Sequence, residues 1–311
     1  MEKPESSSPS RPAQALEAIA SARRRVADWS GQPAARRALL VLGVVVFVAT
    51  AVFSIGALPE RPQSVSWPLL ALAAAVLAPI TQLLTATEYR ETAQLTGVTV
   101  GLAESLKISV ASSAANLLPL PGSFLVRSSA LKVAGADGKA ALAAPLSVGL
   151  AWIGVGGLLA GAWLTATEPT AFAGACLVVG LAALVLSIGA VARSTTPGAL
   201  RRLPRIWTIE AAMTLLAACR YFIIAQAIGF TVSIGQGLAI ELSSIIATAI
   251  GIVPGGLGVR ELLAGGIATL VSISASVGIT IAVLNRVADM VGLIISSVAL
   301  FVLDFGAASA K

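Results

Sequence analysis

Six long apolar stretches limit what this chain can fold into. Each is long enough to cross the hydrocarbon core of a bilayer as a helix, which takes about 20 residues. Of the 311 residues 57% are apolar and 12% are charged, which leaves too few polar side chains to coat a soluble domain. A soluble enzyme, a nucleic-acid-binding protein and a disordered scaffold are therefore excluded, and an all-α polytopic membrane protein is predicted. The predicted spans are 38–58, 67–87, 140–165, 170–192, 207–229 and 277–303.

Positive charges occupy alternate loops. Residues 1–37 hold seven of the 21 Lys and Arg, and the loop 193–205 holds four. Segments 88–103 and 121–139 also carry Lys or Arg, whereas Arg61 is the only basic residue in the loops 59–66, 166–169, 230–239 and 272–276. Basic loops face the cytoplasm, so we expect both termini on the cytoplasmic side of the inner cell membrane. The net charge of +6 is then a topology signal, and no nucleic-acid partner is expected.

Two further apolar segments are interrupted by Pro and Gly, at 104–139 and 233–272. Residues 88–103 and 121–139 are both predicted on the cytoplasmic side, and the loops 230–239 and 272–276 are both predicted on the opposite side. Neither apolar segment is therefore an ordinary crossing. The sequence therefore predicts six transmembrane helices plus two re-entrant helical hairpins that enter from opposite sides. The expected organisation is a basic, partly disordered cytoplasmic arm over 1–37, a membrane domain over 38–305 and a short cytoplasmic tail over 306–311.

The two predicted hairpin tips share the pattern Pro-Gly-x-x-x-Val-Arg, at 121–127 and 254–260, an offset of 133 residues. A Ser-Ser pair precedes each tip, at 112–113 and 243–244. Similar hairpins entering from opposite faces are typical of the inverted repeats of transporters.

An Arg beside the free N–H groups of a helix start is suited to binding a phosphate or carboxylate. We expect the second half-helix of each hairpin to begin near its Arg, so that the two tips form anion sites near mid-membrane. The alternative is a pair of packing turns whose Arg side chains only cap nearby carbonyl groups. The candidate binding residues are Arg127, Arg260, Gly122, Gly255, Gly256, Gly258, Glu261 and Asn116.

Five further charged residues lie within apolar segments: Glu210, Arg220, Glu241, Arg286 and Asp289. Exposure to lipid would be costly, so each is expected to face protein or a wet cavity. Arg286 and Asp289 are three residues apart on one helix and are expected to pair, either as a structural salt bridge or as a gating or proton-coupling element. Glu261 is expected to cap its helix or to bind Arg127 across the repeat.

Some chemistry is excluded by residue type. The chain has no His, and Cys176 and Cys219 lie in apolar stretches, so imidazole bases, His-ligated metals and a disulfide framework are not expected. No phosphate-binding P-loop motif is present. We expect neither a cofactor, nor a metal site, nor catalytic residues. The Gly157–Gly161 pair is read as close helix packing rather than a dimer face.

The segments 115–127 and 252–262 resemble two signatures of the lysylphosphatidylglycerol synthase transmembrane region, the flippase part of bacterial aminoacyl-phosphatidylglycerol synthases. The second is the stronger, through Pro254, Gly255, Gly256, Gly258, Arg260 and Glu261. The resemblance spans about residues 38–305 and implies movement of a lipid headgroup between leaflets. A cytosolic aminoacyl-transferase domain is not expected, since the sequence stops at Lys311, so synthase activity is not implied. Phe124 stands near the place where many members have an acidic residue, which favours an anionic phospholipid or a polyprenyl phosphate over a cationic aminoacyl lipid.

Three functions compete at this point. The first is a flippase for a lipid with a phosphate headgroup, and the second is a secondary transporter of a small anionic solute. The third is a lipid-linked transferase or its accessory subunit, which the absence of His and of an acidic metal-binding cluster disfavours. A homo-oligomer and a partner lipid-modifying enzyme remain open.

Overall fold

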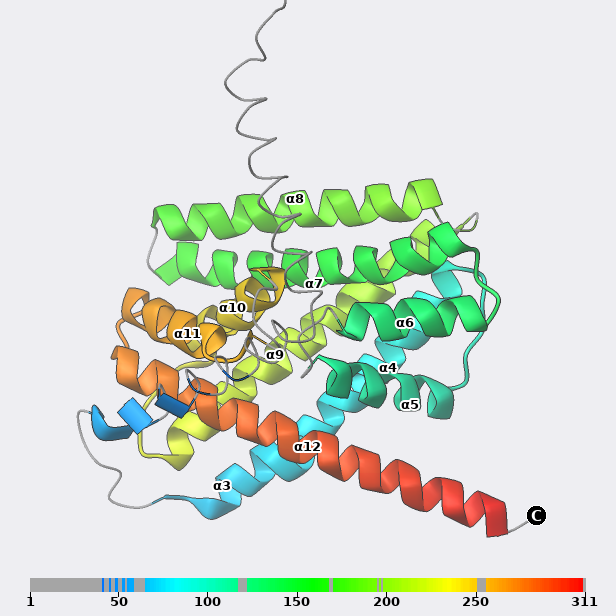
Figure 1. Ribbon diagram of the computed structural model, residues 1–311. Coiled ribbons are helices and arrows are strands. Elements are labelled where there is room, and N and C mark those ends of the chain that lie inside the picture. The colour runs from blue at the N-terminus through cyan, green and yellow to red at the C-terminus, as the bar shows by residue number, and fades with distance from the viewer. Residues whose placement is uncertain are drawn as a thin grey trace, which may run out of the picture.

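The computed structural model describes residues 41, 45, 48–49, 52–53, 55–58, 65–116, 122–167, 170–194, 196, 198–250 and 256–309. Throughout this part of the chain the regular elements are helices (Figure 1). The predicted arm over 1–37 and most of the first predicted span lie outside the described residues.

Five helices are long and apolar enough to cross a membrane, and they match the predicted spans that begin at 67, 140, 170, 207 and 277. The first is continuous from α3 (Trp67–Leu72) through the π-helical turn η1 (Ala73–Leu77) into α4 (Ala78–Leu95), and the π-helical turn ends two residues before Pro79, which has no N–H. The others are α7 (Gly138–Thr167), α8 (Ala171–Ser194), α9 (Leu203–Ala227), which follows the 3-10 turn η2 (Ala199–Arg202), and α12 (Ala275–Ser309).

Four shorter helices form two packed pairs. The first pair is α5 (Leu102–Ala115) with α6 (Gly122–Val133), and the second pair is α10 (Ile234–Ile250) with α11 (Val259–Leu270). At 1.5 Å per residue these helices are roughly 18 to 26 Å long, which is less than the about 30 Å of a hydrocarbon core. The two interrupted apolar segments of the sequence therefore fold as pairs of short helices.

The two pairs lie at opposite ends of the long helices (Figure 1). One end is marked by the hydrogen bond from the Ser66 N–H to the Ala227 carbonyl, at 2.8 Å, and the other by the bond from the Thr196 N–H to the Leu95 carbonyl, at 3.3 Å. The residues that flank the first pair, Val100 and Ala136, are buried in one core cluster with Leu95. The residues that flank the second pair, Val232 and Ile273, pack instead in the cluster that contains Ala225 and Ile228.

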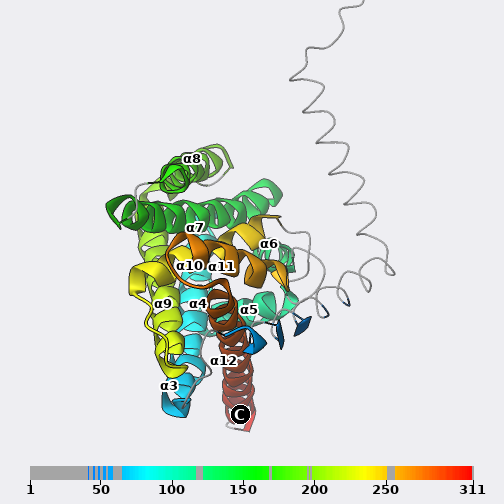
Figure 2. The same ribbon diagram turned by 90° about the vertical axis from the view of Figure 1, so that its left-hand side faces the viewer.

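The order of packing repeats along the chain. Helix α4 packs on α5, α5 on α6 and α6 on α7, and in the same way α9 packs on α10, α10 on α11 and α11 on α12. Helix α7 lies across one side of the remaining helices, and α8 packs on the outer side of α7 (Figure 2). A Cβ at Gly157 would lie 3.1 Å from the Cys176 carbonyl oxygen of α8, so this glycine permits close α7–α8 packing, as predicted.

Candidate functional site

Arg127 extends from α6 to the second half of α4. Its Nη1 donates hydrogen bonds to both carboxylate oxygens of Glu88, at 3.0 and 2.9 Å, and its guanidinium carbon lies 5.9 Å from the centre of the Tyr89 ring. Thr92 Oγ1 donates to Glu88 Oε1 at 3.0 Å. Arg127 and Glu88 are 12% and 3% exposed, so this ion pair is shielded from water by protein.

Glu210 on α9 adds a second carboxyl group to this region. It is 2% exposed, and Glu88 and Arg127 lie within its electrostatic reach. Its Oε2 has no hydrogen-bond partner among the described residues. Trp207 and Thr214 share its helix face at positions i−3 and i+4, and their Nε1 and Oγ1 atoms are likewise buried without a partner. We call Glu88, Tyr89, Arg127 and Glu210 the first cluster.

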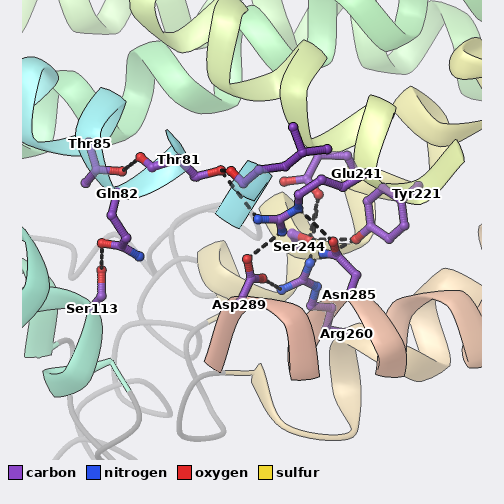
Figure 3. Close-up of polar contacts among 12 residues, drawn as sticks. Thr81, Gln82, Thr85, Ser113, Tyr221, Glu241, Ser244, Arg260, Asn285 and Asp289 are labelled. Carbon is purple, nitrogen blue, oxygen red and sulfur yellow. Dashed lines mark hydrogen bonds and ion pairs between the residues drawn. The ribbon is translucent and has the colours of Figure 1, made fainter. Parts of the chain in front are cut away.

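Arg260 is the centre of a corresponding group at the second pair (Figure 3). Its Nη2 donates to the Tyr221 hydroxyl at 2.9 Å and lies 4.0 Å from Glu241 Oε2, while its Nη1 lies 3.7 Å from Asp289 Oδ2. Ser244 Oγ donates to Glu241 Oε2 at 3.0 Å. These side chains come from α9, α10, α11 and α12 and point toward one another.

Arg220 extends this group toward α4. Its Nη2 lies 2.5 Å from Asp289 Oδ1, its Nε donates to Asn285 Oδ1 at 3.0 Å, and its Nη1 donates to Thr81 Oγ1 at 3.4 Å. Asp289 is therefore shared by two arginines. We call Tyr221, Arg220, Glu241, Arg260 and Asp289 the second cluster.

Glu261 and Arg286 form a separate buried ion pair. Arg286 Nε donates to Glu261 Oε1 at 2.7 Å, and Glu261 Oε2 accepts the Gly258 N–H at 2.7 Å. Glu261 thus caps the start of α11, which is one of its two predicted roles. The other predicted role, a contact with Arg127, is not found, because Arg127 pairs with Glu88. The expected pairing of Arg286 with Asp289 along one helix face is also corrected, because Arg286 pairs with α11 and Asp289 with α9 and α11.

The tip residues play several different structural roles. A Cβ at Gly122 would lie 2.1 Å from the Ala115 carbonyl oxygen, so this glycine allows α6 to begin against the end of α5. Asn116 supports the same junction, since its Oδ1 accepts the Ser123 N–H at 3.0 Å. Gly256 and Gly258 have positive φ angles of 65° and 78°, whereas Gly255 lies outside the described residues.

The two arginines differ in their position on the helix. Arg260 is the second residue of α11, beside the free N–H groups of its first turn, as expected. Arg127 lies five residues after Gly122, the first residue of α6, so the expected proximity to a helix start is wrong for this residue. A helix end cannot contribute to the Arg127 site as it does to the Arg260 site, because the effect falls off within the first turn.

Several side chains of the clusters are absent from the sequence prediction, chiefly Glu88, Tyr89 and Tyr221. The predicted span ended at 87, whereas α4 continues to Leu95 and carries Glu88 and Tyr89 into the interior. The spacing of the two tyrosines could have indicated their role, because they are 132 residues apart, close to the 133-residue offset of the two tips. Each tyrosine contacts one tip arginine.

One polar face of α4 runs between the clusters. Thr81, Thr85 and Glu88 lie at positions i, i+4 and i+7, so they share one side of the helix. Thr81 accepts from Arg220 of the second cluster, and Glu88 binds Arg127 of the first. Gln82, next to Thr81, accepts from Ser113 of α5 at 3.2 Å (Figure 3). The seven residues from Thr81 to Glu88 correspond to a rise of about 10 Å.

Comparison with known proteins adds no relative. A scan against protein-family models, a search of curated proteins and a search of solved structures each gave no match.

Proposed function

We propose that this protein is a flippase that moves an anionic lipid, a phospholipid or a polyprenyl-phosphate-linked lipid, between the leaflets of the cell membrane. The observation that carries the proposal is the repeated arrangement of a tip arginine against a tyrosine and carboxylates, once in each half of the chain. Charged groups buried in a membrane domain are costly to keep and are functional by default.

In this proposal the first and second pairs are re-entrant hairpins that enter from opposite sides. Their helices are shorter than the about 20 residues of a typical span, and their ends lie at opposite ends of the long helices, which supports that reading. Both arginines then lie where a headgroup must pass, while the acyl chains stay in the bilayer.

Each arginine has capacity left for an anion. The Nε atoms of Arg127 and Arg260 are buried with no partner among the described residues. A guanidinium group offers five N–H donors in a planar fork that matches two phosphate oxygens. A phosphate would replace the carboxylate partner at one arginine, follow the polar face of α4 and bind at the other.

The carboxylates would neutralise the two tip arginines between transport events, when no phosphate is bound. A buried guanidinium without a counter-ion is strongly unfavourable, and Glu88, Glu241 and Asp289 avoid that state when no headgroup is bound. Because each arginine is already paired with a carboxylate, the free energy of phosphate binding is only the difference between the arginine–phosphate and arginine–carboxylate pairs. The phosphate is therefore bound weakly enough to leave again.

The test uses purified protein in liposomes with two probes. Phosphatidylglycerol carrying a fluorophore in the inner leaflet should become accessible to a membrane-impermeant quencher faster than in protein-free liposomes. Radiolabelled inorganic phosphate, the soluble probe, should not accumulate inside the same liposomes. Uptake of phosphate without lipid movement would favour the secondary transporter, and movement of neither probe would contradict transport of both kinds of substrate.

A further inference from the structure

The ion network formed by the two clusters and the Glu261–Arg286 pair contains one more acid than base, and Asp289, at 37%, is its most exposed side chain. Its described members are four arginines and five carboxyl groups: Arg127, Arg220, Arg260 and Arg286 against Glu88, Glu210, Glu241, Glu261 and Asp289. An unpaired ionised carboxylate inside a membrane domain would cost far more than taking up a proton.

The excess acid can be assigned to the first cluster. Asp289 contacts two arginines, Glu261 pairs with Arg286, and Glu241 receives a hydrogen bond from Ser244 beside Arg260. In the first cluster a single arginine is within electrostatic reach of two carboxyl groups, and its hydrogen bonds among the described residues go to Glu88. Glu210 remains with a buried, unpartnered Oε2.

We propose that Glu210 holds a proton at neutral pH and that Glu88 and Glu210 together form a proton-binding site linked to anion binding at Arg127. The coupling rests on the proposed function, whereas the bound proton does not. With no headgroup present, Arg127 balances ionised Glu88 and Glu210 is neutral.

The charge balance defines one coupled step. When a singly charged phosphate takes the guanidinium of Arg127, Glu88 loses its counter-ion while Glu210 is already protonated. Glu88 then binds one proton from the aqueous side, so the site stays neutral with one anion and one added proton. Lipid movement would in this way be driven by a proton gradient, one proton for each singly charged headgroup.

The bound proton can be observed without any transport assay. Protein with carboxyl-¹³C glutamate is purified in a maltoside detergent, which has no carbonyl group, and its infrared spectrum is recorded at neutral pH. The wild type should show the C=O stretching band of a protonated glutamic acid. The band should be lost in Glu210→Gln and unchanged in Glu104→Gln, a matched control at an exposed position.

Two more variants test the link to Arg127. Glu88→Gln leaves Glu210 as the sole carboxylate beside Arg127, so Glu210 should ionise and the band should be lost. Arg127→Gln removes the cation, so both acids should be protonated and the band should double in area.

A wild type without the band, a band that survives Glu210→Gln, or a band that survives Glu88→Gln would overturn the proposal. Should Glu210→Gln not fold, the infrared bands of the wild type and of Glu88→Gln still test the proposal. If these spectra behave as expected and no lipid moves in liposomes, the proton site stands and the flippase function fails.

Discussion

Glu261 uses its two carboxylate oxygens for two contacts that hold α11 in place. One oxygen binds the Arg286 guanidinium and the other accepts the Gly258 N–H at the helix start. Glu261 is fully buried, so loss of its charge leaves the positive charge of Arg286 without this counter-ion. We predict that Glu261→Gln lowers the free energy of unfolding by about 3–5 kcal/mol, measured by denaturant unfolding in detergent. The exposed control Glu104→Gln should change it by less than about 0.5 kcal/mol, and equal stability of the two variants would contradict this account.

Arg286 and Asp289 are neutralised by residues on other helices. Exchanging them, with Arg286→Asp and Asp289→Arg in one chain, places each charge beside a like charge. We predict that the exchange is at least as destabilising as Arg286→Ala or Asp289→Ala alone, as judged by thermal unfolding. A double variant that recovers stability relative to both single variants would restore the interpretation of a pair along one helix face.

At the level of elements, the junction between α5 and α6 depends on the absence of a side chain at Gly122. A Cβ there would overlap the Ala115 carbonyl oxygen, which belongs to the backbone and cannot turn away. We predict that Gly122→Ala costs about 1–3 kcal/mol of stability and reduces lipid movement, because α6 carries Arg127. Gly149→Ala in α7 is the matched control, since a Cβ there meets nothing within 4 Å. Equal stability and activity of the two variants would contradict the close approach.

The sequence was sufficient for the five long helices that the structure describes and for the location of the short pairs, because hydropathy and Pro-Gly breaks act locally. It was not sufficient for the partners of the buried charges. Arg127 and Glu88 are 39 residues apart, and Arg220 and Asp289 are 69 apart, so only the packing of helices decides these pairs. Tyr89 was missed because α4 remains helical beyond the apolar run that defined its span.

At the scale of the whole molecule, the proposed topology predicts which loops share a side of the membrane. In a chain with Cys176 and Cys219 replaced by Ala, single cysteines at Thr99 and Ala134 should react with an impermeant thiol reagent from the cytoplasmic side. Cysteines at Thr231 and Ala275 should react from the opposite side. All four positions are exposed in the structure. Labelling of Thr99→Cys and Ala134→Cys from opposite sides would mean that the α5–α6 segment crosses the membrane.

The central claim, that the two tip arginines bind the phosphate of a lipid in transit, is tested most directly by lipid movement in liposomes with matched arginine variants. Loss of a charge-assisted hydrogen bond is worth about 1.5–3 kcal/mol, so Arg127→Ala and Arg260→Ala should each slow phosphatidylglycerol movement roughly ten- to hundredfold. Arg127→Lys and Arg260→Lys should be intermediate, because they keep the charge and lose the fork. Arg90→Ala, an exposed position on α4, should keep the wild-type rate. Arg127→Ala and Arg260→Ala proteins that are folded and still move lipid at the wild-type rate would contradict the claim.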